Sequence, residues 1–199
     1  GIELLKDDDV RLAFCFANMA INLQTQWRRK EDFKYRPFQL AFILMSMESI
    51  VSKDSLFRDT CDLLWVPTGG GKTEAYLVLV ALEMGYRRLD AIKHGKSGAG
   101  VSVITRYTLR LLTIQQFRRS LSMFTAAEFL RVDNLNSKKP IGWRPDQCLN
   151  DNDVLWGSTP FSVGMWVGAG VTPNKLEDTP LRKPPYKIPQ ALTILEDNS

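Results

Sequence analysis

The sequence predicts an α/β domain in which a parallel sheet is flanked by helices, preceded by an N-terminal helical segment. Three observations lead to this prediction. Apolar residues recur at helical spacing near the N-terminus, a short apolar run at 63–66 leads through three glycines into a helix-prone stretch at 73–89, and a second apolar run follows at 101–104. A strand, a helix and a second strand in this order form a βαβ unit with parallel strands.

Length and composition narrow the class of protein. A chain of 199 residues with 44% hydrophobic residues builds one domain, or one domain with an appendage. The net charge of +4 permits an anionic partner without requiring one. Three widely spaced cysteines (Cys15, Cys61, Cys148) and one histidine (His94) argue against a disulfide framework, a zinc site and histidine-based catalysis. With no signal peptide and no long apolar segment, we expect a cytoplasmic chain without a membrane partner.

Residues 1–60 are predicted to form helices. Leu12, Phe16, Met19, Leu23 and Trp27 follow the spacing of one helix face. A second helix is expected over the apolar segment 40–51, preceded by Arg36-Pro37-x-Gln39, because proline suits a first helical turn.

The segment at 35–39 is also a candidate adenine-reading element. The amide of Gln39 both donates and accepts, so it could pair with adenine, while Tyr35 or Phe38 could stack on the ring. We include Arg36 in this predicted nucleotide-binding element. The alternative is that Gln39 only caps the helix.

Residues 66–73 read Val-Pro-Thr-Gly-Gly-Gly-Lys-Thr and predict a phosphate-binding loop. Glycines without a Cβ bring backbone N–H groups close to phosphate oxygens at a helix N-terminus. Lys72 would contact the β- and γ-phosphates of ATP, and Thr73 would be a ligand of Mg²⁺. The predicted cofactors are ATP and Mg²⁺, Lys72 and Thr73 are the candidate catalytic residues, and the candidate binding residues of the loop are Thr68, Gly69, Gly70, Gly71, Lys72, Thr73 and Glu74. Val66 stands where such loops usually begin with Gly or Ala, and the alternative is a turn that binds nothing.

Polar residues at 105–115 form a candidate nucleic-acid contact. Within this stretch, Arg110-x-Leu112-x-x-Gln115 resembles the helicase element that holds a nucleic-acid strand by its phosphates. Threonine hydroxyls, arginines and a helix N-terminus are suitable donors to phosphate. The predicted contact residues are Thr105, Arg106, Thr108, Arg110 and Gln115. The alternative is an ordinary amphipathic helix with arginines on its surface.

The remaining segments complete the predicted division of the chain. A polar loop is expected over 133–153 and a third parallel strand over 160–168, ending in a glycine turn. Five prolines between Pro173 and Pro189 argue against regular structure near the C-terminus. We therefore predict N-terminal helices at 1–60, an ATP-binding lobe at 61–170 and an irregular Pro-rich tail at 171–199.

Taken together, these motifs resemble the first RecA-like lobe of a superfamily 2 helicase, over about residues 10–175. The stretches 64–76, 106–113 and 166–168 resemble, more narrowly, the DrmA-like helicases of the DISARM anti-phage defence system. The resemblance implies a partial RecA-like lobe at 61–170 and ATP-dependent action on DNA in bacterial defence. Implied partners are single-stranded DNA or a duplex junction, a second RecA-like lobe, and another subunit of the defence system.

The chain departs from this family in its acidic residues. Such motors need an Asp-Glu pair after a later strand to hold Mg²⁺ and position water. Here Glu196 and Asp197 follow an apolar run in the reverse order. We therefore expect the full-length protein to hydrolyse ATP, and this chain alone to bind ATP but scarcely hydrolyse it. Two alternatives stay open: a stand-alone P-loop nucleotide-binding or kinase-like protein acting on a small molecule, and a nonenzymatic nucleic-acid-binding module.

Overall fold

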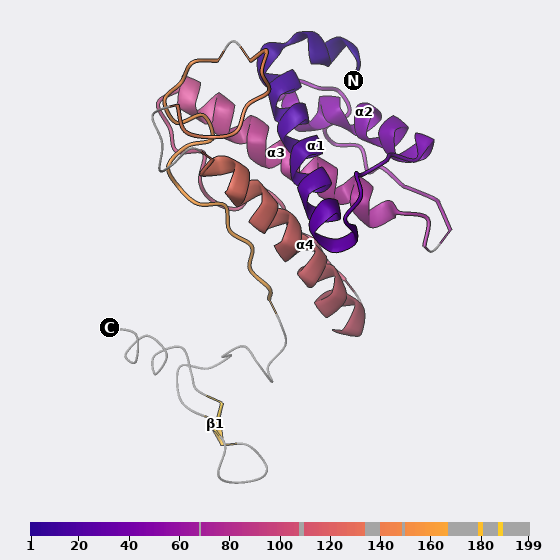
Figure 1. Ribbon diagram of the computed structural model, residues 1–199. Helices are drawn as coiled ribbons and strands as arrows, with labels where there is room; N and C mark the ends of the chain where they lie inside the picture. The colour runs from indigo at the N-terminus through magenta and orange to yellow at the C-terminus, as the bar shows by residue number, and fades with distance from the viewer. Residues whose placement is uncertain are drawn as a thin grey trace. The chain divides into compact units, whose positions relative to one another are not determined.

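The computed structural model describes residues 1–67, 69–107, 110–133, 140–148, 150–166, 179–180 and 187–188. Contacts divide the chain into two units, residues 1–163 and 164–199. Within the described residues, the first unit contains a short 3₁₀ helix η1 (Glu3–Lys6) and the helices α1 (Asp8–Arg29), α2 (Pro37–Val51), α3 (Lys72–Lys93) and α4 (Arg110–Arg131) (Figure 1). The predicted domain divisions at residues 60 and 170 stay predictions.

Helix α1 confirms the amphipathic pattern of the N-terminal segment. Asp7 caps its start, because the Oδ1 atom of Asp7 accepts hydrogen bonds from the backbone N–H groups of Asp9 and Val10 at 2.9 and 3.0 Å. Phe16 is fully buried on its apolar face, whereas Trp27 in the last turns is half exposed. The apolar face of α1 is therefore less buried toward the C-terminal end of the helix.

The core of the first unit lies between the helices. Helix α1 packs against α3 and α4, and α2 packs against α3 (Figure 1). Trp156, from the chain after α4, fills the remaining space, with its ring 4.2 Å from that of Phe16. The Nε1–H group of Trp156 donates to the carbonyl oxygen of Trp143 at 2.8 Å, so its polar atom is satisfied inside the core.

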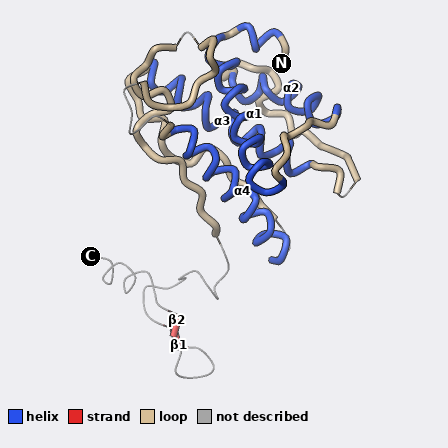
Figure 2. Tube along the Cα trace, in the orientation of Figure 1, coloured by secondary structure: helices blue, strands red, loops and turns tan. Residues whose placement is uncertain are grey.

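The predicted parallel sheet, and with it the partial RecA-like α/β lobe, is wrong for this structure. Among the helices of the first unit, the described residues contain no sheet (Figure 2). Residues 63–66 and 101–104 are irregular, and residues 160–166 are too, while 167–168 lie outside the described residues. A strand is stabilised by hydrogen bonds to a neighbouring strand, and helix-to-helix packing fills the core instead. Apolar side chains in the segments 63–66 and 101–104 accordingly face outward: Trp65 is 89% exposed and Ile104 is 87% exposed.

The described loop residues between α4 and residue 154 contain no helix or strand, as the sequence predicts, apart from an isolated bridge between Ile141 and Val154. The guanidinium of Arg144 fixes this loop by donating to four backbone carbonyl oxygens, at 2.6 to 3.4 Å. In the second unit, the described residues of the Pro-rich tail form a two-residue antiparallel pair, β1 (Thr179–Pro180) with β2 (Lys187–Ile188). No helix in the described part of the chain has both the length and the apolar character needed to span a membrane.

Two methionines of α2 provide a matched test of the packing. Met47 is fully buried in the core, whereas Met45 on the same helix is 80% exposed. We expect Met47→Ala to lower the free energy of unfolding by about 2–5 kcal/mol, because it leaves a cavity. Met45→Ala should change it by no more than about 0.5 kcal/mol. Urea denaturation of both variants measures the difference, and equal losses would contradict the described orientation of α2.

Candidate functional site

The glycine loop lies directly before the N-terminus of α3. Gly71 precedes Lys72 at a φ of 94°, and Gly69 has a φ of 78°. Both values fall in the left-handed region, which favours glycine because a side chain strains the backbone there. The N–H group of Gly70 donates to the carbonyl oxygen of Pro67 at 3.1 Å, which closes the turn.

The N-terminus of α3 differs from that of α1 in having no side-chain cap. Its N-cap residue is Gly71, which makes no side-chain capping bond, whereas Asp7 caps α1. The first N–H groups of an α-helix have no partner within the helix, and they carry the positive end of the helix dipole. The start of α3 is therefore suited to an anion such as a phosphate.

Lys72 and Thr73 are the first two residues of α3 and line the same cavity as the loop. The ammonium group of Lys72 donates to the carbonyl oxygens of Val66 and Pro67, at 3.0 Å in the case of Pro67. These bonds fold the lysine back over the loop, so its charge lies at the wall of the cavity.

Helix α2 holds the loop through the two polar residues of the predicted adenine-reading element. The amide nitrogen of Gln39 donates to the carbonyl oxygen of Gly71 at 2.7 Å, and the guanidinium of Arg36 donates to that of Gly70 at 3.0 Å. The Oε1 atom of Gln39 also accepts from the backbone N–H of Arg36 at 2.8 Å. Gln39, only 3% exposed, thus caps α2 and supports the loop, and adenine reading stays a prediction.

The predicted stacking residue Tyr35 lies away from the loop. Its hydroxyl donates to Asn18 Oδ1 on α1 at 2.7 Å, and its ring meets Phe33 edge-on at 4.9 Å. Burial raises the pKa of Tyr35 above its ordinary value. Phe33 lines the cavity beside the loop, while Tyr35 and Phe38 do not. The structure therefore brings Arg36 and Gln39 to the loop, but not Tyr35.

The cavity beside the loop has a volume of about 910 Å³, which suits a nucleotide-sized ligand. It is lined by the loop, the start of α3, the end of α1 and one face of α4. Basic side chains outnumber acidic ones around it: Arg28, Arg29, Lys34, Arg36, Lys72 and Arg119 against Glu31, Asp32 and Glu74. Such an excess attracts a polyanion.

Sequence reasoning missed several residues of this cavity, among them Tyr107, Gln116 and Arg119. Arg119 forms an ion pair with Glu74, and burial raises the pKa of Tyr107 while Arg119 opposes the rise. A signal was present in the spacing of α4, whose buried face includes Met123, Ala127 and Leu130. Continued toward the N-terminus by steps of three or four, that face reaches Arg119 and Gln116.

The predicted nucleic-acid contacts are placed only in part. Thr105 and Arg106 are exposed, and Gln115 is exposed on α4. Arg110 is the first residue of α4, but its side chain lies outside the described part. Thr108 and the loop residue Thr68 also lie outside the described residues.

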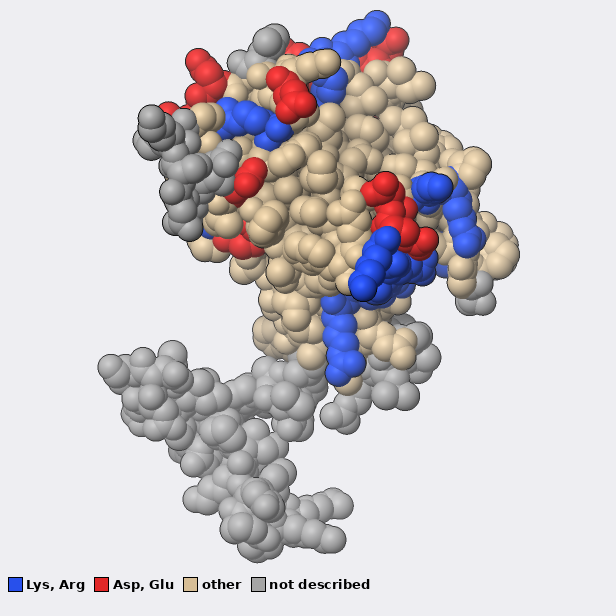
Figure 3. All heavy atoms as spheres, in the orientation of Figure 1, with Lys and Arg blue, Asp and Glu red and all other residues tan. Residues whose placement is uncertain are grey.

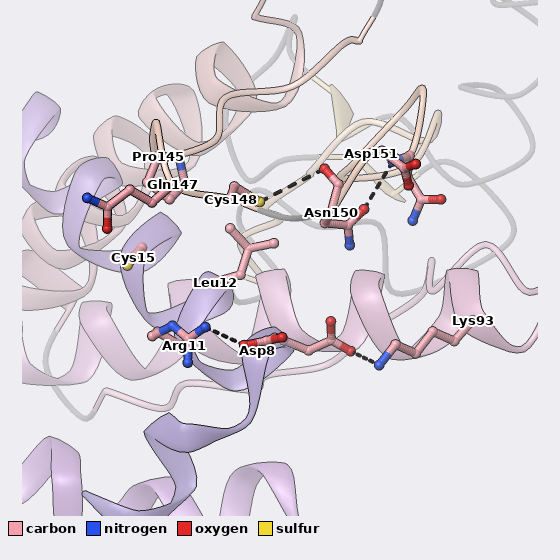
Figure 4. A pocket seen from close by; sticks show the side chains of 12 residues that line it. Asp8, Arg11, Leu12, Cys15, Lys93, Pro145, Gln147, Cys148, Asn150 and Asp151 are labelled. Atoms are coloured by element: carbon pink, nitrogen blue, oxygen red, sulfur yellow. Dashed lines mark hydrogen bonds and ion pairs between the residues drawn. The ribbon is translucent and has the colours of Figure 1, made fainter.

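A second cavity of about 720 Å³ lies between α1, the end of α3 and the loop residues at 145–148 and 150–152 (Figure 4). Two of its charged pairs are satisfied within the protein, because Arg11 pairs with Asp8 and Lys93 pairs with Asp9. Burial raises the pKa of Cys15 and keeps its thiol protonated, which argues against a nucleophilic role. We therefore regard the glycine-loop cavity as the stronger candidate.

The distribution of charge and of metal-binding groups limits the chemistry of the surface. On the face shown in Figure 3, basic and acidic side chains are interspersed rather than gathered into one basic area. In the described residues, no three His, Cys, Asp or Glu side chains lie together in a group that could hold a metal ion. The backbone N–H groups at the start of α3 and the ammonium of Lys72 are groups that can bind a phosphate.

Comparison with known proteins gives one informative similarity. The chain is 41% identical over 198 residues to the DISARM protein DrmA of Bacillus paralicheniformis, an alignment that covers 89% of this chain. The chain spans 16% of the length of that curated relative. It is therefore a relative of DrmA over most of its own length. No protein-family model matches the chain. No solved structure matches it either.

Two glycines of the loop test how α2 supports it. A Cβ at Gly71 would lie 2.6 Å from Gln39 Nε2, whereas a Cβ at Gly69 would meet nothing within 4 Å. Both positions have positive φ, so Gly69→Ala should cost about 1–2 kcal/mol from backbone strain alone. Gly71→Ala should cost more, since it also displaces Gln39. Urea denaturation measures both, and an equal loss of stability would mean that the Gln39 contact contributes nothing.

Proposed function

We propose that this chain is the ATP-binding part of an ATP-dependent DNA helicase or translocase that acts in bacterial anti-phage defence. The observation that carries the proposal is the uncapped N-terminus of α3, where a glycine loop, Lys72 and Thr73 meet in a basic cavity. Few other arrangements leave so many backbone donors directed at one place beside a lysine.

Different groups in the cavity would bind different parts of a triphosphate. The N–H groups at the start of α3 would hold phosphate oxygens, and Lys72 would exchange the carbonyl oxygens of Val66 and Pro67 for the β- and γ-phosphates. The hydroxyl of Thr73 is suited to Mg²⁺, which neutralises phosphate charge when bound. Arg36 and Gln39 keep the loop in this position through the carbonyl oxygens of Gly70 and Gly71.

The defence role rests on the similarity to the DISARM protein DrmA. Hydrolysis of ATP requires carboxylates that position water, and the described residues hold no cluster of acidic side chains suited to a metal ion. We therefore assign hydrolysis to the full-length protein, in which the remainder of the motor supplies those groups. This chain alone would bind ATP and hydrolyse it very slowly.

DNA is the proposed polymer substrate. The chain passes from Tyr107, which lines the cavity, to the start of α4 at Arg110. Thr105, Arg106, Thr108, Arg110 and Gln115, the predicted phosphate contacts, therefore adjoin the nucleotide site in sequence. A single strand held there would lie next to the loop that binds ATP.

Two lysines of the chain distinguish phosphate binding from general electrostatics. We expect Lys72→Ala to abolish binding of ATP, because it removes the charge at the phosphates. Lys96→Ala is the matched control, since Lys96 is exposed just beyond the opposite end of the 22-residue α3 and should leave ATP affinity unchanged. Isothermal titration with Mg·ATP measures both. Wild-type affinity in Lys72→Ala would remove the basis of the assignment.

Two arginines of α4 test the contact with DNA. Arg110→Ala should weaken binding of a single-stranded oligonucleotide and reduce the slope of log affinity against log salt by about one, while leaving ATP affinity intact. Arg118→Ala removes the same charge from an exposed position of α4 and serves as the control. Fluorescence anisotropy at several salt concentrations provides the slopes, and identical slopes in the two variants would count against Arg110.

A further inference from the structure

The ion pair between Glu74 and Arg119 joins the glycine loop to α4. Glu74 lies in the first turn of α3, two residues after Lys72, and Arg119 projects from α4, 45 residues further along the chain. Their side chains are 19% and 29% exposed, and both line the loop cavity. A partly buried pair is screened less by salt than a surface pair, so its charges act on each other strongly.

The backbone of Arg119 is held by a hydrogen bond from α1, but one nitrogen of its side chain has no hydrogen-bond partner. Its carbonyl oxygen accepts a hydrogen bond from Gln24 Nε2 of α1 at 2.8 Å. Its Nε atom is buried without a hydrogen-bond partner, and so is the Oε1 atom of Gln116 one turn earlier. Buried polar atoms without partners are costly, so a different arrangement of this wall would recover part of that cost. A ligand that offered these two atoms hydrogen-bond partners would therefore compete with the present arrangement of the pair.

A phosphate at the loop would act on the two partners in opposite directions. Its negative charge would repel the carboxylate of Glu74 and attract the guanidinium of Arg119, both of which face the cavity. Because Arg119 belongs to α4, a change in this pair reaches the helix that begins at Arg110. The same link operates in reverse, since coupling between two binding sites is reciprocal.

From these contacts we propose that the Glu74–Arg119 ion pair couples occupancy of the loop cavity by a nucleotide to binding of single-stranded DNA at the start of α4. Arg119 is then a positioning residue for the nucleotide site. This inference rests on the proposed function, because it requires both ligands. The competing explanation is a pair that only stabilises the fold.

The test compares the affinity of the 199-residue chain for a nucleotide in the presence of DNA with its affinity in the absence of DNA. The dissociation constant of a non-hydrolysable ATP analogue is determined with and without a saturating single-stranded oligodeoxynucleotide. In the wild type we expect DNA to tighten binding of the analogue by about fivefold or more. In Arg119→Gln the ratio should fall to near one. Arg118→Gln, the matched control on the same helix, and Arg119→Lys, which keeps the charge, should both retain most of the wild-type ratio.

The outcomes separate this inference from the proposed function. A wild type that does not bind the analogue overturns the proposed function itself. A wild type that shows coupling, with an unchanged ratio in Arg119→Gln, overturns the inference alone, even if that variant melts at a lower temperature. Should Arg119→Gln fail to fold, Glu74→Gln removes the same pair from the side of α3. Its ratio must then also fall to near one, and a wild-type ratio there overturns the inference.

Discussion

The attachment of the glycine loop to α2 is the contact on which the candidate site depends. The carbonyl oxygens of Gly70 and Gly71 are bound by Arg36 and Gln39, so they point toward α2. With its carbonyls held there, the loop can present the opposite side of its backbone, and the start of α3, to the cavity. Gln39 can do this because it is almost fully buried and its Oε1 atom is fixed by the N–H of Arg36. The side chain of Gln39 thus both caps the N-terminus of α2 and holds the glycine loop in place.

The helices could be predicted from the sequence, and the sheet could not, for a physical reason. Helical spacing in α1 and the glycine-to-lysine transition before α3 are local signals, and local hydrogen bonds satisfy a helix. The backbone N–H and C=O groups of a strand form their hydrogen bonds with a neighbouring strand. Short apolar runs such as 63–66 and 101–104 therefore do not determine a strand by themselves. Here the helices and Trp156 fill the core, and the side chains of Trp65 and Ile104 are left exposed. The prediction of a parallel sheet extended a local pattern to a long-range arrangement.

The parts of the candidate site that depend on local sequence could be predicted in the same way, and the parts that depend on long-range contacts could not. Gly69 to Thr73 form one continuous segment, and its geometry follows from glycine conformation and the start of a helix. Of the two interpretations of Gln39, the structure confirms the cap of α2, and adenine reading stays a prediction; the contact of its amide with the loop belonged to neither. Tyr35 turned instead to Asn18 on α1, a contact between residues 17 positions apart that no local pattern reveals. Arg119 was missed because only its helical spacing from Met123 and Ala127, and no adjacent residue, distinguishes it from the exposed Arg118.

The contrast between Arg118 and Arg119 shows how position on a helix gives identical residues different roles. Arg119 continues the buried face of α4 that contains Met123 and Ala127, so its guanidinium is directed inward, to Glu74. An arginine on that face must find a carboxylate or leave a charge unpaired in a partly buried place, which is expensive. Glu74, at the first turn of α3, satisfies it, and a glutamate there also suits the helix dipole. A phosphate anion would compete with Glu74 for both the dipole and the arginine. The pair therefore lies where, under the proposed function, the charge of a nucleotide would act on a side chain of α4.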